Sequence, residues 1–228
     1  RKKELVRYDV FNHQGLALRE IRESDLDTSI ELVTIKKALD SFLIYNYFDT
    51  TTNSPIRKAV LPSSDKRLNF DGSNLPLVIN TIRINDKSNY KRIVMRLKEV
   101  NPNFNNIDFK LVGNGIELLL DESGLEKSVH VNQISDGTLR YLCLLTITYN
   151  PNRGSIICID EPEVGLHPDM ISGLAQAFEE VGDNSTFMLS THSESFLNHF
   201  PVEAIRVFEK DSGNRTIIKQ FATSELKS

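Results

Sequence analysis

Residues 155–162 read Ser-Ile-Ile-Cys-Ile-Asp-Glu-Pro, a short apolar run that ends in two adjacent carboxylates, Asp160 and Glu161. An apolar run of this length is typical of a strand that is covered on both faces of a parallel sheet. A second such run, Thr186–Leu189, follows after a helical pattern at Pro168–Val181. Strand, helix and strand in this order predict parallel neighbours with a right-handed crossover. We therefore expect an α/β fold with a mostly parallel sheet and flanking helices.

Asp160 and Glu161 directly follow the first of these strands. In open parallel sheets, ligands bind in the crevice at the carboxyl ends of the strands. One carboxylate at this point can hold Mg²⁺, and the other can orient or deprotonate an attacking water. A pair of strand-end acids that face solvent explains the same two residues. From the carboxylates alone, both interpretations stay open.

His192 stands at the end of the second strand, within Ser190-Thr191-His192-Ser193. If the two strands are adjacent and parallel, His192 opens onto the same crevice as the carboxylates. A histidine there can donate a hydrogen bond to a γ-phosphate oxygen. A capping or solvent-facing histidine is the alternative, but the carboxylates one strand away favour the functional interpretation.

The start of a predicted buried helix, Gly137–Thr148, is the third candidate. Backbone N–H groups at a helix start bind anions, and Gly137 permits close approach of a phosphate. Ser135 adds a hydroxyl donor. An ordinary N-cap by Ser135 or Asp136 explains the same residues, and it is the preferred interpretation of this feature taken alone.

Together, these segments resemble the second half of an ABC-type nucleotide-binding domain of the RecF-like and SMC-like ATPases. Residues 134–138 resemble a variant of the ABC signature motif, with Asp136 in place of its first glycine. Residues 156–162 resemble a Walker B motif with its catalytic glutamate, and residues 190–193 resemble the H-loop. Residues 163–168 resemble a D-loop, with His167 where transporter-type domains carry an aspartate. The likeness is firm over residues 130–210, and a shorter one covers residues 71–76.

The resemblance implies a P-loop NTPase fold of the ABC-ATPase type that binds ATP and Mg²⁺. Asp160 would organise Mg²⁺, Glu161 would polarise the hydrolytic water, and His192 would sense the γ-phosphate. It also implies a head-to-tail homodimer with nucleotide sandwiched between the protomers. The nucleotide-binding residues would be Ser135, Asp136, Gly137, Thr138 and His167, of which Ser135 and Gly137 would contact the γ-phosphate of ATP held by the second protomer.

A P-loop of the form Gly-x-x-x-x-Gly-Lys-Ser/Thr is absent, because none of the 11 glycines is followed by lysine. In this family the P-loop lies near the N-terminus. We therefore expect the chain to be the C-terminal part of a longer ATPase and to be inactive alone; a degenerate domain is the alternative. Two other functions stay open: a DNA-repair or chromosome-structure ATPase with DNA as partner, and a non-hydrolysing scaffold of a defence system that gates an effector nuclease.

The composition of the 228 residues is 39% hydrophobic and 25% charged, and no apolar run is long enough to cross a bilayer. With 27 Lys and Arg against 31 Asp and Glu, the net charge of −4 argues against an overall basic coat for nucleic acid. Cys143 and Cys158 lie in apolar runs and predict buried free thiols, as in a cytoplasmic protein. A local basic face is formed by Lys87, Lys91, Arg92, Arg96 and Lys98, which we expect to be solvated.

Residues 1–125 are expected to form an N-terminal α+β part with a helical subdomain. Residues 126–228 would form the lobe with the signature helix, Walker B and H-loop motifs. Turn residues between apolar runs predict a hairpin over Leu5–Phe11 and Gly15–Ile21. Hydrophobic periodicity predicts helices over Glu31–Tyr47 and Asp86–Val100. A further helix is predicted after Asp71–Asn74, with a capping side chain and with Pro76 in its first turn. Further hairpins are predicted around residues 113–115 and 211–214, and a short helix over Ser193–Phe200.

Overall fold

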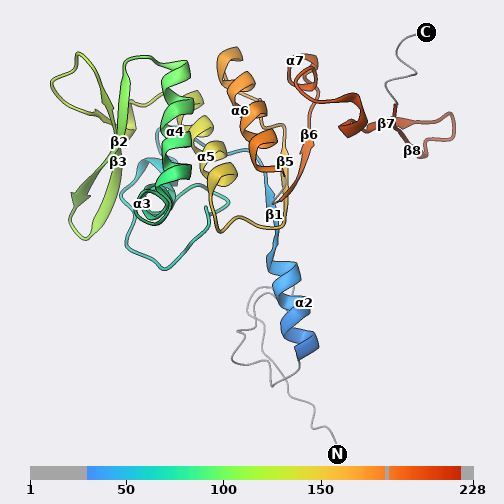
Figure 1. Cartoon of the computed structure of the whole chain (residues 1–228), viewed down its shortest axis with the longest axis horizontal. Helices are drawn as coiled ribbons and strands as arrows, with labels where there is room; N and C mark the ends of the chain where they lie inside the picture. The colour runs from blue at the N-terminus through green and yellow to red at the C-terminus, as the bar shows by residue number, and fades with distance from the viewer. Residues whose placement is uncertain (1–29, 183–184, 222–228) are drawn as a thin grey trace, which may run out of the picture.

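The computed structural model describes residues 30–182 and 185–221 (Figure 1). The predicted hairpin at Leu5–Phe11 and Gly15–Ile21 lies outside these residues. The α-helices are α2 (Ile30–Asp40), α3 (Leu75–Asn85), α4 (Lys87–Val100), α5 (Asp136–Tyr149), α6 (Pro168–Val181) and α7 (Glu194–Leu197). The strands are β1 (Phe42–Tyr45), β2 (Phe104–Val112), β3 (Gly115–Glu122), β4 (Val129–His130), β5 (Ile156–Asp160), β6 (Thr186–Ser190), β7 (Val207–Lys210) and β8 (Thr216–Lys219).

The central sheet is parallel and has the strand order β1-β5-β6. Its register pairs Tyr45 with Ile159 and Asp160 with Ser190, so the three strands end at the same edge. Helix α6 connects β5 to β6, as the strand–helix–strand pattern predicted. The α/β fold with a parallel sheet and flanking helices is therefore confirmed.

The prediction of one helix over Glu31–Tyr47 is wrong beyond Asp40. Helix α2 ends there, and Ser41 closes it by donating from its backbone N–H to Lys37 and Ala38 carbonyls. Residues Phe42–Tyr45 then form β1, in which Leu43 and Tyr45 are buried and Phe42 and Ile44 are exposed. Pairing with β5 along four residues replaces the helical hydrogen bonds. The contact between the strands therefore outweighs the helical spacing of the apolar residues in this segment.

Helix α3 begins at Leu75 with Pro76 in its first turn, as predicted, but the predicted capping side chain is not present. The Asn74 amide makes its hydrogen bonds to the preceding loop instead. It accepts from the Asn69 N–H at 2.8 Å and donates to the Arg67 carbonyl at 2.9 Å. Asn74 therefore stabilises the chain before the helix rather than the helix start.

The remaining predicted elements are present with small shifts of their ends. Asp86 caps α4 by accepting from the Asn89 N–H, and β2 and β3 form the predicted antiparallel hairpin. Strands β7 and β8 pair as the second hairpin, and α7 is shorter than the predicted Ser193–Phe200. Figure 1 shows β2 and β3 on one side of the helices and the parallel sheet on the other.

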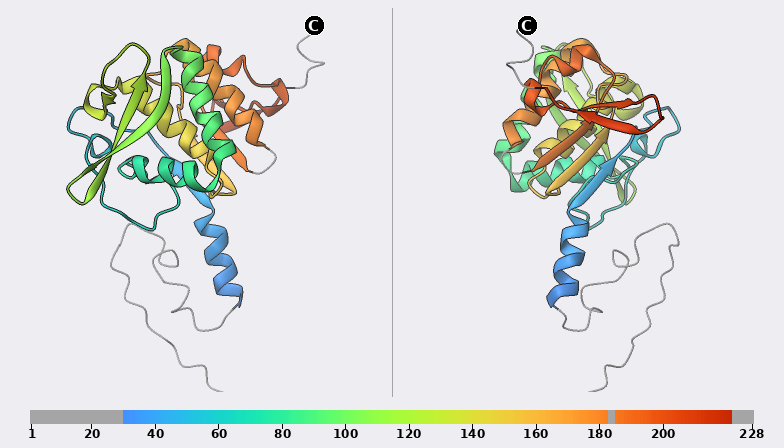
Figure 2. Two further views of the ribbon diagram at one scale, coloured as in Figure 1. Left: turned by 60° about the vertical axis from the view of Figure 1, so that its left-hand side comes forward. Right: turned by 90° about the vertical axis from the view of Figure 1, so that its right-hand side faces the viewer.

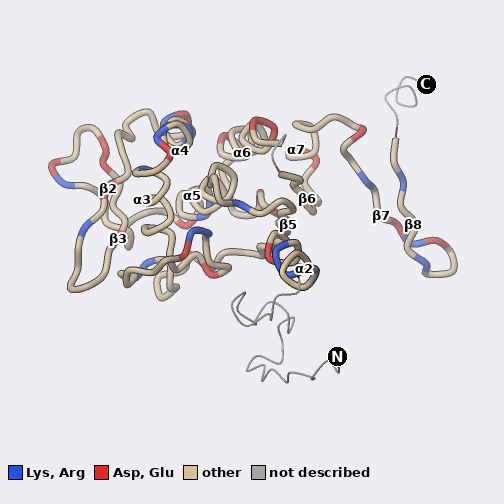
Figure 3. The backbone as a smooth tube through the Cα atoms, turned by 60° about the horizontal axis from the view of Figure 1, so that its bottom comes forward, with Lys and Arg blue, Asp and Glu red and all other residues tan. Residues whose placement is uncertain are grey.

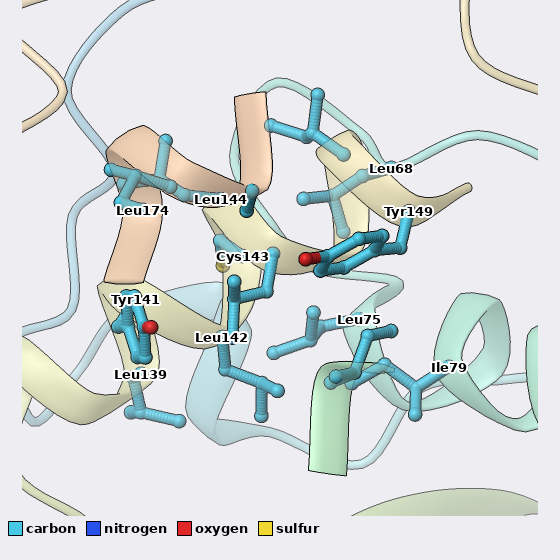
Figure 4. Packing of buried hydrophobic residues seen from close by; sticks show 14 of the residues in the cluster. Leu68, Leu75, Ile79, Leu139, Tyr141, Leu142, Cys143, Leu144, Tyr149 and Leu174 are labelled. Atoms are coloured by element: carbon cyan, nitrogen blue, oxygen red, sulfur yellow. The ribbon is translucent and has the colours of Figure 1, made fainter. Parts of the chain in front are cut away.

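Helix α5 forms the centre of the core, because every residue from Leu139 to Tyr149 is buried. Leucines 139, 142 and 144 and Tyr149 pack among side chains of α3 and α6, as Figure 4 shows. Cys143 lies in this core as a free thiol whose pKa is raised by burial. Cys158 is also a free thiol, but it is only half-buried.

Leu145 is fully buried in α5, so its truncation tests how much this core contributes to stability. Leu145→Ala should lower the free energy of unfolding by about 2–5 kcal/mol, because apolar contacts are lost and a cavity is left. Leu111→Ala, at a leucine that is 80% exposed, is the matched control and should change it by less than about 0.5 kcal/mol. Denaturant unfolding followed by circular dichroism measures both. Equal effects would contradict this placement of the core.

The prediction that the strands are covered on both faces is wrong for the part of the chain that the structure describes. One face, with Leu43, Tyr45, Ile157 and Ile159, is buried in the same core cluster as the apolar residues of α5 and α6. The opposite face carries Phe42, Ile44, Cys158 and Met188, of which Ile44 is 62% and Met188 59% exposed. The right-hand view of Figure 2 looks from this side of the molecule.

Candidate functional site

Asp160 and Ser190 are the last residues of two adjacent parallel strands, and their side chains meet at the edge of the sheet. The Ser190 hydroxyl donates a hydrogen bond to Asp160 Oδ1. Asp160 is exposed, so its carboxylate oxygens can still bind a ligand at this edge of the sheet, where the parallel strands end. This is the edge at which open parallel sheets bind ligands.

Glu161 leaves the sheet in a left-handed backbone conformation, with a φ of 43°. For a residue other than glycine this conformation costs about 1 kcal/mol or more and is often found at functional sites. Its backbone N–H donates to the Ser190 carbonyl at 3.1 Å and to the Ser190 hydroxyl at 3.2 Å. The turn brings Glu161 Oε1 to 3.8 Å from His192 Nε2. The structure therefore places the predicted residues Asp160, Glu161 and His192 together.

The start of α5 is an N-cap, which was the preferred interpretation of this feature from the residues alone. The Ser135 hydroxyl accepts from the Thr138 N–H at 3.1 Å and lies 2.8 Å from the Thr138 hydroxyl. Asp136 accepts a hydrogen bond at 2.7 Å from Arg57, a buried residue. The guanidinium of Arg57 balances the negative charge that Asp136 brings to the helix start.

The start of α5 also touches the loop that follows Glu161. A Cβ atom at Gly137 would lie 2.9 Å from the Gly165 carbonyl oxygen, so only glycine fits without a shift. One turn later, the buried Arg140 donates hydrogen bonds to the Val164 carbonyl and to the Phe48 carbonyl. The Tyr47 ring covers this guanidinium at 3.6 Å. Helix α5 and the loop 161–167 are thus joined within one chain.

His167 caps α6: its Nδ1 accepts from the Asp169 N–H at 3.4 Å. Its side chain is exposed, as is that of Asp169. The structure places His167 at the far end of the loop 161–167 from Glu161. Its contact with nucleotide stays a prediction.

Asn46 is a candidate that sequence reasoning missed. It follows directly on β1, whose last residue pairs with Ile159, and it is exposed. Its amide therefore stands at the same edge of the sheet as Asp160. The signal was a polar residue after an apolar run, but the run was assigned to a helix. Arg57 and Arg140 were missed because their partners are distant in sequence.

The basic face predicted on α4 is only partly a solvated face. Lys87, Lys91 and Lys98 are exposed, and Arg92 is half-buried, but Arg96 is buried and pairs with Glu99 and Glu180. Figure 3 shows the blue basic positions of α4 with the red acidic positions of α6 close by. Arg96 therefore stabilises the contact between these helices.

Metal-binding clusters and membrane-spanning helices are both absent from the described ranges. No group of three or more His, Cys, Asp and Glu there could hold a metal ion by itself. His130 Nε2 lies 2.7 Å from Glu117 Oε2. Within the same ranges, no helix combines the length and the apolarity that a membrane span requires.

Curated relatives match the chain over short stretches. The retron Vc95 probable ATPase of Vibrio cholerae serotype O1 biovar El Tor is 29% identical over 105 residues, which is 46% of this chain and 20% of that protein. An uncharacterized protein of Methanocaldococcus jannaschii is 29% identical over 90 residues, which is 40% of this chain and 23% of that protein. The matched stretches thus span about a fifth of the length of these relatives.

Among solved structures, an SmcHead bound to the C-winged helix domain of ScpA has a TM-score of 0.56 and 13% sequence identity. The similarity covers 80% of this chain and 56% of that chain, and it shows that the fold is of the P-loop NTPase type. A family described as "AAA domain, putative AbiEii toxin, Type IV TA system" matches residues 31–198, most of the 228 residues. The chain therefore belongs to this family of AAA domains, with the fold of an ABC/SMC-like ATPase head.

Proposed function

We propose that the chain is the signature-helix and Walker B part of a switch that binds and hydrolyses ATP as a head-to-tail homodimer. The observation that carries this proposal is the meeting of Asp160, Glu161 and His192 at the carboxyl edge of adjacent parallel strands. Their order and spacing are those that the resemblance to RecF-like and SMC-like ATPases requires. Membership of the AAA family and the SMC-head fold support the ATPase class.

The residues at this edge fit Mg²⁺ in the form that nucleotide sites use. Mg²⁺ is bound through one or two carboxylates together with phosphates and waters, rather than by a cage of protein ligands. Asp160 offers an exposed carboxylate, and Ser190 and Asn46 offer a hydroxyl and an amide at the same edge. A bound Mg²⁺ would supply charge neutralisation at the phosphates. Asp160 would hold it, with Ser190 fixing the orientation of the carboxylate.

Glu161 would orient the attacking water and accept its proton, and His192 would donate a hydrogen bond to a γ-phosphate oxygen. The 3.8 Å contact between these side chains lets both approach one reacting group. The left-handed turn at Glu161 supports this role, because strain of this kind is retained where a side chain must be aimed.

The start of α5 would serve nucleotide that is held by the second protomer. Ser135, Asp136, Gly137 and Thr138 would present backbone N–H groups and hydroxyls to the γ-phosphate, with His167 nearby in the interface. The pairing of Asp136 with Arg57 supports this assignment, because it offsets a carboxylate that would otherwise repel phosphate.

The sequence holds no Gly-Lys pair, so in this proposal the phosphate cradle would be supplied by another part of a longer parent protein. A P-loop is a strand, a Gly-rich loop and a helix. The apolar sheet face with Ile44 and Met188 offers a place for such a strand and helix, because parallel sheets are normally covered on both faces. We propose that a P-loop segment of a longer parent protein packs there, in a cytoplasmic protein.

The purified 228-residue chain tests whether ATP hydrolysis requires a P-loop from another segment. It should show no ATP turnover above that of its Glu161→Gln variant and at most weak ATP affinity, because no lysine and backbone cradle holds the phosphates. Measurement of phosphate release and of equilibrium ATP binding checks both expectations. Turnover that depends on Glu161 in this chain alone would contradict the assignment.

DNA is a second candidate partner, and the exposed Lys87, Lys91 and Lys98 on α4 favour it. Binding through phosphates would weaken steeply as the salt concentration rises. The other alternative that we retain is a non-hydrolysing scaffold of a defence system that gates an effector nuclease. The description of the matched family, which names a putative AbiEii toxin of a type IV TA system, is consistent with this alternative.

A further inference from the structure

Glu163 lies two residues after Glu161 and is 8% exposed. One of its carboxylate oxygens, Oε1, accepts a hydrogen bond from the Thr191 hydroxyl. The other oxygen, Oε2, is buried and has no hydrogen-bond partner in the part of the chain that the structure describes. A buried oxygen without a partner is unfavourable, because the group has lost its hydration. The place of Glu163 therefore requires a reason beyond packing.

Thr191 stands directly before His192, and its hydroxyl makes two contacts. It donates to Glu163 Oε1, and it accepts from the Ser193 N–H at 2.9 Å. The backbone is thereby held on both sides of His192. The imidazole itself is 93% exposed, so its position depends on this backbone rather than on packing around the ring.

Glu163 is itself held in a fixed turn. The Leu166 N–H donates to the Glu163 carbonyl at 3.0 Å, and the Val164 N–H donates to the Glu161 carbonyl at 3.1 Å. One short turn thus carries both Glu161, which faces His192, and Glu163, which holds the residue before His192. The distance between the two proposed catalytic side chains is set by this turn and by the Thr191 hydroxyl.

We propose that Glu163 is a positioning residue that holds His192 against Glu161 through the Thr191 hydroxyl. This proposal rests on the proposed function of Glu161 and His192 in ATP hydrolysis. Glu163 does not touch the reacting atoms. It fixes the backbone position of His192, so that the imidazole can reach the γ-phosphate.

The test uses the full-length parent protein that contains a P-loop. Glu163→Ala and Thr191→Val should each lower kcat by on the order of 10²-fold, since a misplaced catalytic group costs about that much, with KM for ATP nearly unchanged. Thr191→Ser keeps the hydroxyl and should retain most of the wild-type rate. Glu179→Ala, at an exposed glutamate of α6, is the matched control and should behave as wild type.

Combination with His192→Ala separates positioning from a general structural role. If Glu163 acts through His192, adding Glu163→Ala to His192→Ala should cause little further loss of kcat. Independent, multiplying losses would overturn the proposal. If Glu163→Ala folds poorly, Thr191→Val combined with His192→Ala tests the same expectation, because valine has nearly the same shape as threonine.

Amide hydrogen exchange at Ser193 tests the contact without ATP. Thr191→Val removes the acceptor of the Ser193 N–H, and Glu163→Ala frees the hydroxyl to rotate, so exchange at Ser193 should be faster in both. Exchange in Glu161→Gln should match wild type. Unchanged Ser193 exchange in both variants overturns the positioning role of Glu163. A wild-type parent without ATP turnover would instead overturn the proposed function, which keeps the two failures distinct.

Discussion

Glu161→Gln in a P-loop-containing parent should lower the rate of ATP hydrolysis by about 10²–10⁴-fold, the range expected for loss of a general base. Glutamine keeps the size of the side chain but removes the charge that orients and deprotonates water. ATP binding should survive, because the proposed Mg²⁺ ligand Asp160 and the P-loop would still be intact. The variant should therefore accumulate as an ATP-bound dimer, which size-exclusion chromatography with ATP and Mg²⁺ detects.

Glu179→Gln supplies the control, since Glu179 is an exposed glutamate on α6, away from the edge of the sheet. It should hydrolyse ATP at the wild-type rate and dissociate after turnover. Two results would count against the role of Glu161: unchanged turnover in Glu161→Gln, and loss of ATP binding in a variant that is otherwise folded.

Ser135→Arg should abolish turnover by preventing the ATP-driven dimer. Ser135 is exposed at the start of α5, so an arginine there projects from the surface that is proposed to face the partner's nucleotide. A single protomer should still bind ATP, because its own P-loop is intact. Ser123→Arg, at an exposed serine beside β3, adds the same side chain elsewhere and should leave the dimer unchanged.

Mixing Ser135→Arg with a P-loop lysine variant should restore part of the activity. A heterodimer of the two forms one intact composite site, with the good P-loop of one chain and the good Ser135 of the other, as two-fold symmetry requires. Turnover of the 1:1 mixture is compared with each variant alone. If heterodimers form but remain as inactive as both parents, Ser135 does not act across the interface.

Sequence patterns predicted the parallel strands and the residues at their ends, because the apolar runs of β5 and β6 are short and each stops at polar side chains. That topology brings Asp160, Glu161 and His192 to one edge of the sheet, whereas the left-handed turn at Glu161, which brings its carboxylate near His192, was not predicted. The helix predicted through Tyr47 failed because its apolar spacing also fits a helix, whereas pairing with β5 decides the outcome. The division at residue 125 stays a prediction.

Contacts between distant parts of the chain could not be predicted. Arg57 reaches Asp136 across 79 residues, and Arg140 reaches Phe48 across 92. Neither arginine stands in a recognisable motif, so no local pattern indicates which carbonyl or carboxylate it will meet. The burial of Arg96 was missed for the same reason, since Glu180 lies 84 residues away.

Arg140 connects α5 to the loop 161–167, because its guanidinium donates a hydrogen bond to the carbonyl of Val164, 24 residues away in the sequence. A ligand that favours one arrangement of the α5 start must also favour the matching arrangement of the loop with Glu161. If a ligand at the α5 start changes the affinity for a second ligand at this loop, reciprocity requires the second ligand to change the affinity for the first by the same factor, and such couplings are typically worth about 1–3 kcal/mol. In the proposed homodimer, this guanidinium would couple the nucleotide site of one protomer to the site that the same protomer completes for its partner.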